Sequence, residues 1–297
     1  MHQSEDGDME NRLANLGGPD KFAIILGCAK SGTTSLYEYL VRHPEICECS
    51  TREPNSSTYY LKEGKERYKN LWDWDPSVHE YAMEKSNQYT YPTGVAPPSG
   101  PEVPSFVSDL KEIKAEFHFL YIVRDPIERA KSHLKHYIVQ GYDVQYRRPA
   151  DIPWLVGTSQ YAKRLEPFAK TFGRENIFVL TFEDLVGKPK KTVDQVCDFL
   201  GLPSAPDPPN KNYNPTDGVW NTSLWNKLRD ISLLREGFRK IPIKFRSKVR
   251  RFFNSSIEEE VGFDRPQREK FVDIIREDVG IMRDKYDVDI SGWSVEV

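Results

Sequence analysis

The apolar residues of this chain gather in short runs that end at glycine or at a charged residue. Phe22–Leu26 is followed by Gly27, and Phe117–Val123 is followed by Arg124. Runs of this length that end in turn or charged residues are typical of buried strands. The stretch Asn176–Asp184 repeats the pattern with an acidic end, so a third strand is predicted there.

Helical patterns alternate with these runs. They open at Thr33 and cover Ile127–Gln140, Gly157–Phe172, Pro189–Leu200 and Pro266–Lys285. Strands that alternate with helices predict an α/β domain with a central, mainly parallel sheet flanked by helices. Two proline-rich stretches are predicted as irregular connectors rather than helices, Pro92–Pro104 and Pro203–Pro215.

Length and termini complete this outline. The 297 residues are enough for one large domain with a sizeable core. The polar stretch 1–20 is predicted to be a disordered leader, and residues 21–297 a single domain. No signal peptide is visible, and no apolar run reaches the roughly 20 residues of a membrane span. A cytoplasmic protein without a transmembrane segment is therefore expected.

Charge and cysteine content narrow the choice of partners. The net charge of −3 gives no general attraction to nucleic acid. Of the four cysteines, Cys47 and Cys49 have the wrong spacing for a zinc knuckle, and no second pair exists. Free thiols in a reducing compartment, and no metal site, are predicted. The sequence leaves the oligomeric state open.

The polar segment after the first strand carries the strongest chemical signal. Cys28-Ala-Lys-Ser-Gly-Thr-Thr-Ser35 joins a strand to the start of a helix. Backbone N–H groups and the positive end of the helix dipole converge on such a joint. Lys30 adds a charge and several side chains add hydroxyl donors, namely Ser31, Thr33, Thr34 and Ser35. Together with Gly32, these residues predict a site for a phosphate or a similar oxyanion.

The order of residues in this loop separates two kinds of phosphate site. A Walker A loop requires Gly-Lys-Ser/Thr after four intervening residues, whereas here Lys30 precedes Gly32. The stretch instead resembles the Lys-Ser/Thr-Gly-Thr-Thr loop of sulfotransferases that use 3′-phosphoadenosine 5′-phosphosulfate (PAPS). That resemblance implies a P-loop-like phosphosulfate-binding loop.

A second segment supports the same family. Arg124 ends a strand, Pro126 suits a first helical position, and Ser132 follows eight residues after the arginine. This spacing resembles the family's 3′-phosphate site, and a guanidinium with a hydroxyl can hold three phosphate oxygens. The alternative is that Arg124 forms a helix-start ion pair with Asp125 while Ser132 is a surface hydroxyl.

The remainder of the chain is similar to the heparan sulfate N- and O-sulfotransferase branch and to small bacterial sulfotransferases. Tyr213-Asn-Pro-Thr-Asp-Gly-Val-Trp220 looks like the segment that brings an aromatic ring to the nucleotide, which implies a cofactor contact for Trp220. A basic stretch, residues 235–251, could face an acidic acceptor or a membrane, or it could be a solvated helix.

Sulfuryl transfer requires charge stabilisation on the leaving phosphate and removal of a proton from the acceptor. Lys30 is the candidate for the first task. Thr51-Arg-Glu-Pro-Asn55 resembles the family region whose glutamate is the base, which implies that role for Glu53. Glu84-Lys85-Ser86 resembles the family's Glu-Lys-Ser/Thr motif, which implies that Lys85 lies near the sulfuryl group or the acceptor.

The base has open alternatives. Glu53 could instead be a helix-capping carboxylate or an ion-pair partner of Arg52. A histidine could also serve, since His118 lies on a predicted strand and His133 and His136 lie on a predicted helix.

The expected function is transfer of a sulfuryl group from PAPS, without a metal, to a hydroxyl or amine of a small-molecule or carbohydrate acceptor. Two alternatives remain in view. A P-loop kinase would need the missing Walker order and an acidic magnesium ligand. A catalytically inactive nucleotide-binding protein would have no use for Lys30, Glu53 and Lys85 together.

Overall fold

The computed structural model describes residues 18–51, 53–54, 68–92, 103–113, 115–140, 148–209 and 263–297. Its strands are β1 (Lys21–Gly27), β2 (Ile46–Glu48), β3 (Tyr81–Lys85), β4 (Glu116–Val123) and β5 (Ile177–Thr181). Its α-helices are α2 (Thr33–Leu40), α5 (Val103–Glu112), α6 (Pro126–Gln140), α7 (Pro153–Thr158), α8 (Tyr161–Phe172), α9 (Phe182–Gly187), α10 (Pro189–Leu200) and α14 (Arg265–Tyr286). Short 3₁₀ turns are η1 (Asn87–Thr90), η2 (Pro149–Asp151) and η3 (Arg174–Asn176).

The strands form one five-stranded sheet in the order β2-β3-β1-β4-β5 within the described residues, and every pair is parallel. The expected mainly parallel α/β architecture is therefore confirmed. After β1 the chain forms β2 and β3 on one side of that strand, and it then crosses to form β4 and β5 on the other side. Ligands of open α/β sheets bind at such a reversal, beyond the carboxyl ends of the strands.

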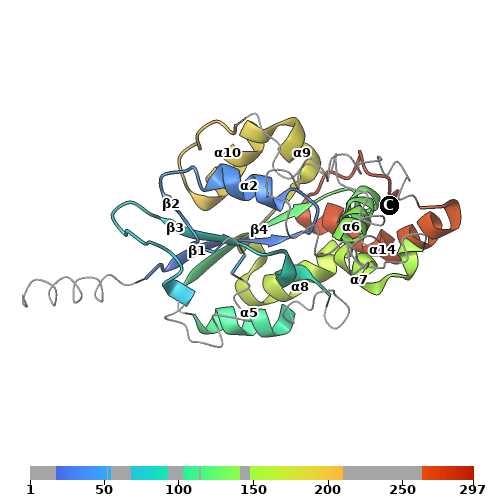
Figure 1. The fold of residues 1–297 in the computed structure, drawn as a ribbon, viewed down its shortest axis with the longest axis horizontal. Coiled ribbons are helices and arrows are strands. Elements are labelled where there is room, and N and C mark those ends of the chain that lie inside the picture. Colours follow the sequence, from blue (N-terminus) through green and yellow to red (C-terminus); the bar gives the residue numbers. More distant parts are fainter. Residues whose placement is uncertain are drawn as a thin grey trace, which may run out of the picture.

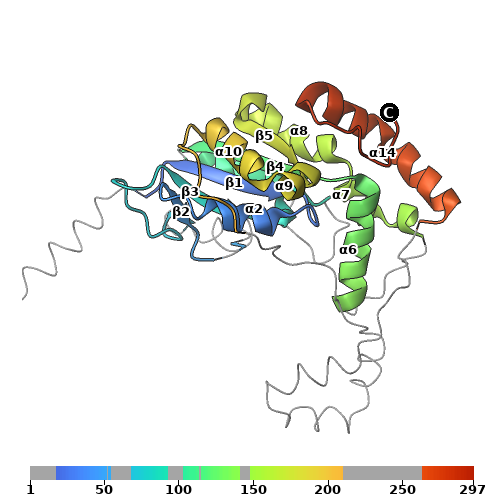
Figure 2. The ribbon, with the colours of Figure 1, turned by 90° about the horizontal axis from the view of Figure 1, so that it is seen from above.

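Helices cover both faces of the sheet (Figure 1), as a parallel sheet requires. Phe22 and Ile24 of β1 point into the core shared with α5 and α8, whereas Ala23 and Ile25 point toward α2 and α10. The long helix α14 lies outside α8 and adds Phe271 to the first core (Figure 2). No described helix combines the length and apolarity needed to cross a membrane.

Two strands were not predicted from the sequence. β2 has only three residues, which is too short for a period to show. β3 ends in Glu84 and Lys85, and two charged residues interrupt the apolar run that would mark a buried strand. Both charged residues are nevertheless buried. Their burial is a property of the assembled site and not of the local sequence.

Three predicted boundaries were wrong. The helix expected over Gly157–Phe172 is broken at Ser159 and Gln160, so that α7 and α8 are separate. The strand expected to Asp184 ends at Thr181, whose hydroxyl caps α9. Helix α5 includes Pro104, because a proline in the first turn has no intrahelical bond to lose. Boundaries of this kind are the least certain part of any reading from sequence.

Helix α14 stabilises the start of α8 through Asp278. The carboxylate accepts hydrogen bonds from the backbone N–H groups of Ala162 at 3.0 Å and Lys163 at 2.9 Å. Burial outweighs these bonds and raises the pKa of Asp278 to about 6. Since the folded-state pKa lies above that of the unfolded chain, ionisation of Asp278 destabilises the fold.

Asp278→Asn should therefore change how stability depends on pH. Relative to the variant, wild type should lose roughly 3 kcal/mol of unfolding free energy as pH rises from about 3 to about 7. Urea unfolding of both proteins at several pH values measures this difference. Asp273→Asn, an exposed carboxylate on the same helix, is the matched control and should show no such change. A constant difference between wild type and Asp278→Asn across this range would contradict the argument.

Candidate functional site

The loop between β1 and α2 turns sharply at two positions. Lys30 has φ 70° and Gly32 has φ 89°, both in the left-handed region. A Cβ on Gly32 would lie 3.0 Å from the Phe182 ring. Glycine therefore suits both the positive φ and the limited space at this position. Successive turns of this kind direct backbone N–H groups into one concavity. The expected anion-binding geometry is therefore compatible with the observed backbone.

The first turn of α2 opens onto this loop. Gly32 occupies the N-cap without a side-chain hydrogen bond, and Thr33, Thr34 and Ser35 are the first three helical residues. The initial N–H groups of a helix have no intrahelical acceptor, so they are available to an anion. Ser31 is fully buried and its hydroxyl has no hydrogen-bond partner. An unsatisfied buried hydroxyl in this loop fits a site that binds an anionic group.

Lys30 and Arg124 meet at the reversal of the sheet. Arg124 Nη1 donates to the Lys30 carbonyl oxygen at 3.3 Å, and its guanidinium lies 4.5 Å from the Phe182 ring centroid. Burial, and next the Arg124 charge, lower the pKa of Lys30. Neither cation forms an ion pair with a carboxylate in the part of the chain that the structure describes. Two adjacent cations without a counter-charge favour a bound anion.

Asp125 does not neutralise Arg124, although the sequence offered that alternative. Its Oδ1 accepts from the backbone N–H of Ile127 at 2.8 Å and of Glu128 at 3.0 Å, which caps α6. Its Oδ2 accepts from the N–H of Ser294. Asp125 before Pro126 is a recognisable helix-start signature, and this signal could have assigned the cap from sequence.

Ser132 lies on α6, partly exposed, and no hydrogen bond joins it to Arg124 among the described residues. Its shared role at a 3′-phosphate stays a prediction. Trp220 and the basic stretch 235–251 lie outside the described residues, as do residues 1–17 of the expected leader.

Glu53 and Lys85, separated by 32 positions, are brought together. Lys85 Nζ donates to Glu53 Oε1 at 2.7 Å. The lysine side chain is 6% exposed and the glutamate side chain 41% exposed, so the carboxylate faces solvent while the ammonium is held inside. Lys85 lies at the carboxyl end of β3 beside Ile25 of β1. Glu53 is thus an ion-pair partner of Lys85, whereas Arg52 lies outside the described residues.

Glu84 points to the opposite face of β3 from Lys85. It is fully buried, and its Oε1 accepts a hydrogen bond from the Tyr89 hydroxyl at 2.7 Å. Burial, opposed by Tyr89 and Tyr68, raises the pKa of Glu84 to about 7. The motif Glu84-Lys85-Ser86 therefore places one acid in the core and one cation at the site.

The loop also contacts the segment that follows β3. The Thr33 hydroxyl donates to Asn87 Oδ1 at 3.1 Å, and the Ser86 N–H donates to the Ile25 carbonyl at 3.1 Å. These contacts hold the carboxyl end of β3 against the phosphate-type loop. Three neighbouring strands, β3, β1 and β4, thus deliver Lys85, Lys30 and Arg124 to one edge of the sheet.

The candidate histidines lie in different environments. His118 is near Tyr81 at the opposite end of the sheet. His133 is buried, with Arg129 at one ring nitrogen and Tyr91 at the other, so it has no nitrogen free to take a proton. Burial, and next the charge of Lys30, lower the pKa of His136 to about 4.

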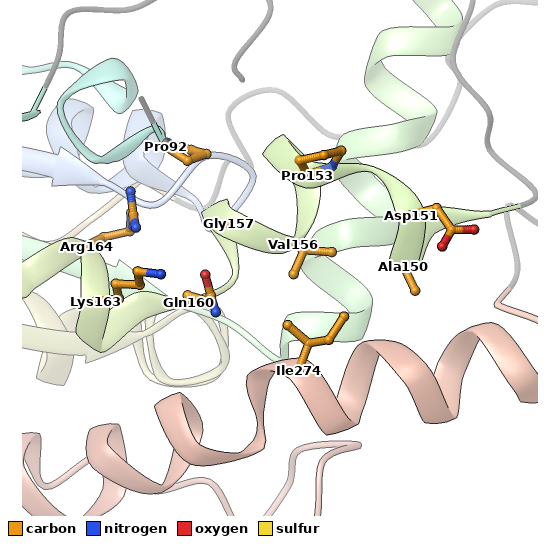
Figure 3. A pocket seen from close by; sticks show the side chains of 10 residues that line it. All are labelled: Pro92, Ala150, Asp151, Pro153, Val156, Gly157, Gln160, Lys163, Arg164 and Ile274. Carbon is orange, nitrogen blue, oxygen red and sulfur yellow. The ribbon is translucent and has the colours of Figure 1, made fainter. Parts of the chain in front are cut away.

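A separate pocket lies between α7, the start of α8 and α14 (Figure 3). Its volume is about 310 Å³, and it is lined by Pro92, Ala150, Asp151, Pro153, Val156, Gly157, Gln160, Lys163, Arg164 and Ile274. None of the site residues predicted from sequence lines it. No group of three or more histidine, cysteine or acidic residues among those described is arranged to hold a metal ion.

Comparison with known proteins agrees with this geometry. The model of the sulfotransferase family matches residues 23–207. Mouse (Mus musculus) heparan sulfate glucosamine 3-O-sulfotransferase 3A1 is 28% identical over 209 residues, which are 66% of this chain and 49% of that protein. Human (Homo sapiens) heparan sulfate glucosamine 3-O-sulfotransferase 5 is 26% identical over 244 residues, 74% of this chain and 65% of that protein. The chain thus spans about half to two thirds of the length of these relatives.

A solved structure shares the fold. The sulfotransferase from Alicyclobacillus acidocaldarius superposes with a TM-score of 0.60 at 19% identity, covering 94% of this chain and 99% of that one. The matched family segment runs from β1 through α10, and it contains the β1–α2 loop, Glu53, Lys85 and Arg124. The chain belongs to the sulfotransferase family.

Proposed function

We propose that this protein transfers a sulfuryl group from PAPS to a hydroxyl, or an amine, of a carbohydrate or small-molecule acceptor. One observation carries the proposal: Lys30 and Arg124 lie together at the reversal of the sheet, without a carboxylate partner among the described residues, beside the uncapped start of α2. PAPS, with its 5′-phosphosulfate and its 3′-phosphate, would supply the negative charge that these two cations lack.

The donor occupies the β1–α2 loop in this proposal. Its 5′-phosphosulfate accepts from the loop N–H groups and from the hydroxyls of Ser31, Thr33, Thr34 and Ser35. Arg124 and Ser132 hold the 3′-phosphate, and Trp220 contacts the nucleotide. The S–O bond to the phosphate breaks as the S–O bond to the acceptor forms, so charge collects on the leaving phosphate. The Lys30 ammonium is fixed where that charge develops.

Glu53 is proposed as the general base and Lys85 as the residue that orients it. The ion pair at 2.7 Å directs the carboxylate, while its exposure leaves the second oxygen open to an acceptor. The acceptor proton passes to Glu53 as the acceptor oxygen attacks sulfur. Lys85 is also proposed to stabilise the charge on the sulfuryl oxygens.

The acceptor class and the setting belong to the same proposal. The names of the relatives, heparan sulfate glucosamine 3-O-sulfotransferases, favour a sugar hydroxyl. The proposal includes one domain over residues 21–297, which is supported by the core cluster that joins Phe22 of β1 to Phe271 and Val295. A cytoplasmic setting is supported by the four buried cysteines, all of them free thiols.

Labelled transfer tests the proposal. The purified chain is incubated with ³⁵S-labelled PAPS and a panel of glucosamine-containing oligosaccharides, alcohols, phenols and amines. Label should move to at least one acceptor, without added metal. ATP with Mg²⁺ in parallel tests for kinase activity. Tight binding of 3′-phosphoadenosine 5′-phosphate without transfer to any acceptor would favour the inactive alternative.

Lys30→Ala should reduce kcat far more than it weakens nucleotide binding. Removal of one fixed charge from the leaving phosphate should cost on the order of 10²-fold or more in kcat at saturating PAPS. Single-turnover kinetics and calorimetry measure the two effects. Lys131→Ala, which breaks only a surface pair with Glu128, is the control. Near-wild-type turnover in Lys30→Ala would remove Lys30 from the mechanism.

Glu53→Gln should preserve shape and donor affinity but remove the base. Loss of a general base typically costs about 10²–10⁴-fold in kcat. The acidic limb of the pH–rate profile should vanish in the variant, because no carboxylate remains to be protonated. Glu128→Gln on α6 should leave both rate and profile unchanged. If the acidic limb persists in Glu53→Gln, another residue is the base.

Arg124→Ala should erase the preference for a 3′-phosphorylated nucleotide. Wild type should bind 3′-phosphoadenosine 5′-phosphosulfate about 30- to 1000-fold more tightly than adenosine 5′-phosphosulfate, since a charge-assisted bidentate contact and a hydroxyl bond depend on that phosphate. Calorimetry with both nucleotides measures the ratio in each protein. Arg148→Ala, an exposed arginine, should keep the wild-type ratio. Equal affinity of wild type for the two nucleotides would leave Arg124 without this role.

A further inference from the structure

A fully buried arginine lies beneath the site with only neutral partners. Arg129 on α6 has no exposed surface. Its Nε and Nη2 donate to Ser159 Oγ at 3.1 and 2.7 Å, and Nη2 also donates to the Leu155 carbonyl at 2.8 Å. Its remaining contact is between Nη1 and His133 Nδ1 at 2.9 Å. No carboxylate of the described residues pairs with it.

This arginine fixes the tautomer of His133. A guanidinium can only donate, so Nδ1 must accept and the ring proton must be on Nε2. Burial, then the charges of Arg129 and Lys30, keep the pKa of His133 well below its usual value, so the ring stays neutral. Trp154 packs against the imidazole edge-to-face, with centroids 4.9 Å apart, which holds the ring plane.

The fixed imidazole in turn orients Tyr91. His133 Nε2 and the Tyr91 oxygen are 3.3 Å apart, and the nitrogen is the donor, so the phenol oxygen accepts. The Tyr91 proton is left free to point elsewhere. Unlike His133 and Arg129, Tyr91 is only partly buried. The relay therefore ends in a phenol hydroxyl whose proton has no acceptor among the described residues.

The turn that precedes Tyr91 is held against β1 and the β1–α2 loop, because the Thr33 hydroxyl donates to Asn87 Oδ1 at 3.1 Å and the Thr90 hydroxyl donates to the Leu26 carbonyl at 3.0 Å. Burial chiefly raises the pKa of Tyr91, and the Glu53 carboxylate is near enough to contribute. Lys30 is near enough to His133 to lower the pKa of that ring. Tyr91 therefore follows a turn at the end of the sheet that also carries the Lys30 loop and the Lys85–Glu53 pair.

We infer that the Tyr91 hydroxyl donates a hydrogen bond to an oxygen of the sulfuryl group, with His133 and Arg129 as positioning residues that aim it. This inference rests on the proposed function and deepens it, because it adds a contact to the group being transferred. The contact exists with PAPS and is absent with 3′-phosphoadenosine 5′-phosphate, which has lost its sulfuryl group. The difference between these nucleotides isolates Tyr91 from the rest of the donor site.

Calorimetry on wild type and Tyr91→Phe with both nucleotides, in the absence of acceptor, tests this. Tyr91→Phe should weaken PAPS binding about 5- to 10-fold and leave the affinity for 3′-phosphoadenosine 5′-phosphate unchanged. With an acceptor, kcat should fall on the order of 10²-fold, as expected for loss of one oriented donor. Tyr81→Phe is the matched control, since Tyr81 contacts His118 at 3.4 Å in the same way but lies at the amino end of β3, opposite the proposed site.

His133→Phe should shift the ratio of the two affinities as Tyr91→Phe does, and the double variant should shift it no further. Because the ratio cancels general damage to binding, a purely structural role would leave it at the wild-type value in Tyr91→Phe. An unchanged ratio in Tyr91→Phe, together with a wild type that binds and transfers normally, overturns this inference and leaves the proposed function standing. If wild type binds neither nucleotide, the proposed function itself fails. Should His133→Phe not fold, Tyr91→Phe still decides the matter.

Discussion

The arrangement of this protein depends on positive charge that is withdrawn from solvent and has no matching carboxylate among the described residues. Lys30 and Arg124 meet, partly buried, at the edge of the sheet, and Arg129 lies fully buried, where its partners in the described part of the chain are hydroxyl, carbonyl and imidazole groups. Such burial is costly unless hydrogen bonds or a bound anion offset it. The nearby acids are committed elsewhere: Asp125 caps α6, and Glu53 pairs with Lys85. The remaining positive potential is the feature on which the proposed binding of a doubly phosphorylated nucleotide rests.

Sheet order creates this concentration of charge. Because β1 lies between β3 and β4, residues that follow three parallel strands emerge at one edge. The β1–α2 loop supplies Lys30 and the open helix start, β4 supplies Arg124, and the end of β3 supplies Lys85. Cores on both faces keep the strands in register, so the positions of these side chains are set by packing far from the site.

Adjacent residues in this site have opposite environments. Glu84 is enclosed in the core, where burial raises the pKa to about 7, while Lys85 reaches the solvent-facing Glu53. A strand achieves this because successive side chains point to opposite faces. On α6 the helical period has the opposite result. Arg129 and His133 are one turn apart, so both face inward, and together they orient Tyr91.

The sequence by itself determined the parallel α/β fold, the strand–loop–helix at Lys30 and the strand end at Arg124, because glycine positions, apolar runs and the helix start are local signals. Only the tertiary structure decided that β3 is a strand, that α7 and α8 are separate, and that Glu53 meets Lys85. The charged residues in β3 interrupt the apolar pattern that would have predicted a buried strand. The carboxylate that caps α8 is on α14, 116 positions away in the sequence. The Arg129–His133–Tyr91 relay likewise depends on burial, which fixes protonation and direction where the sequence shows only three polar residues.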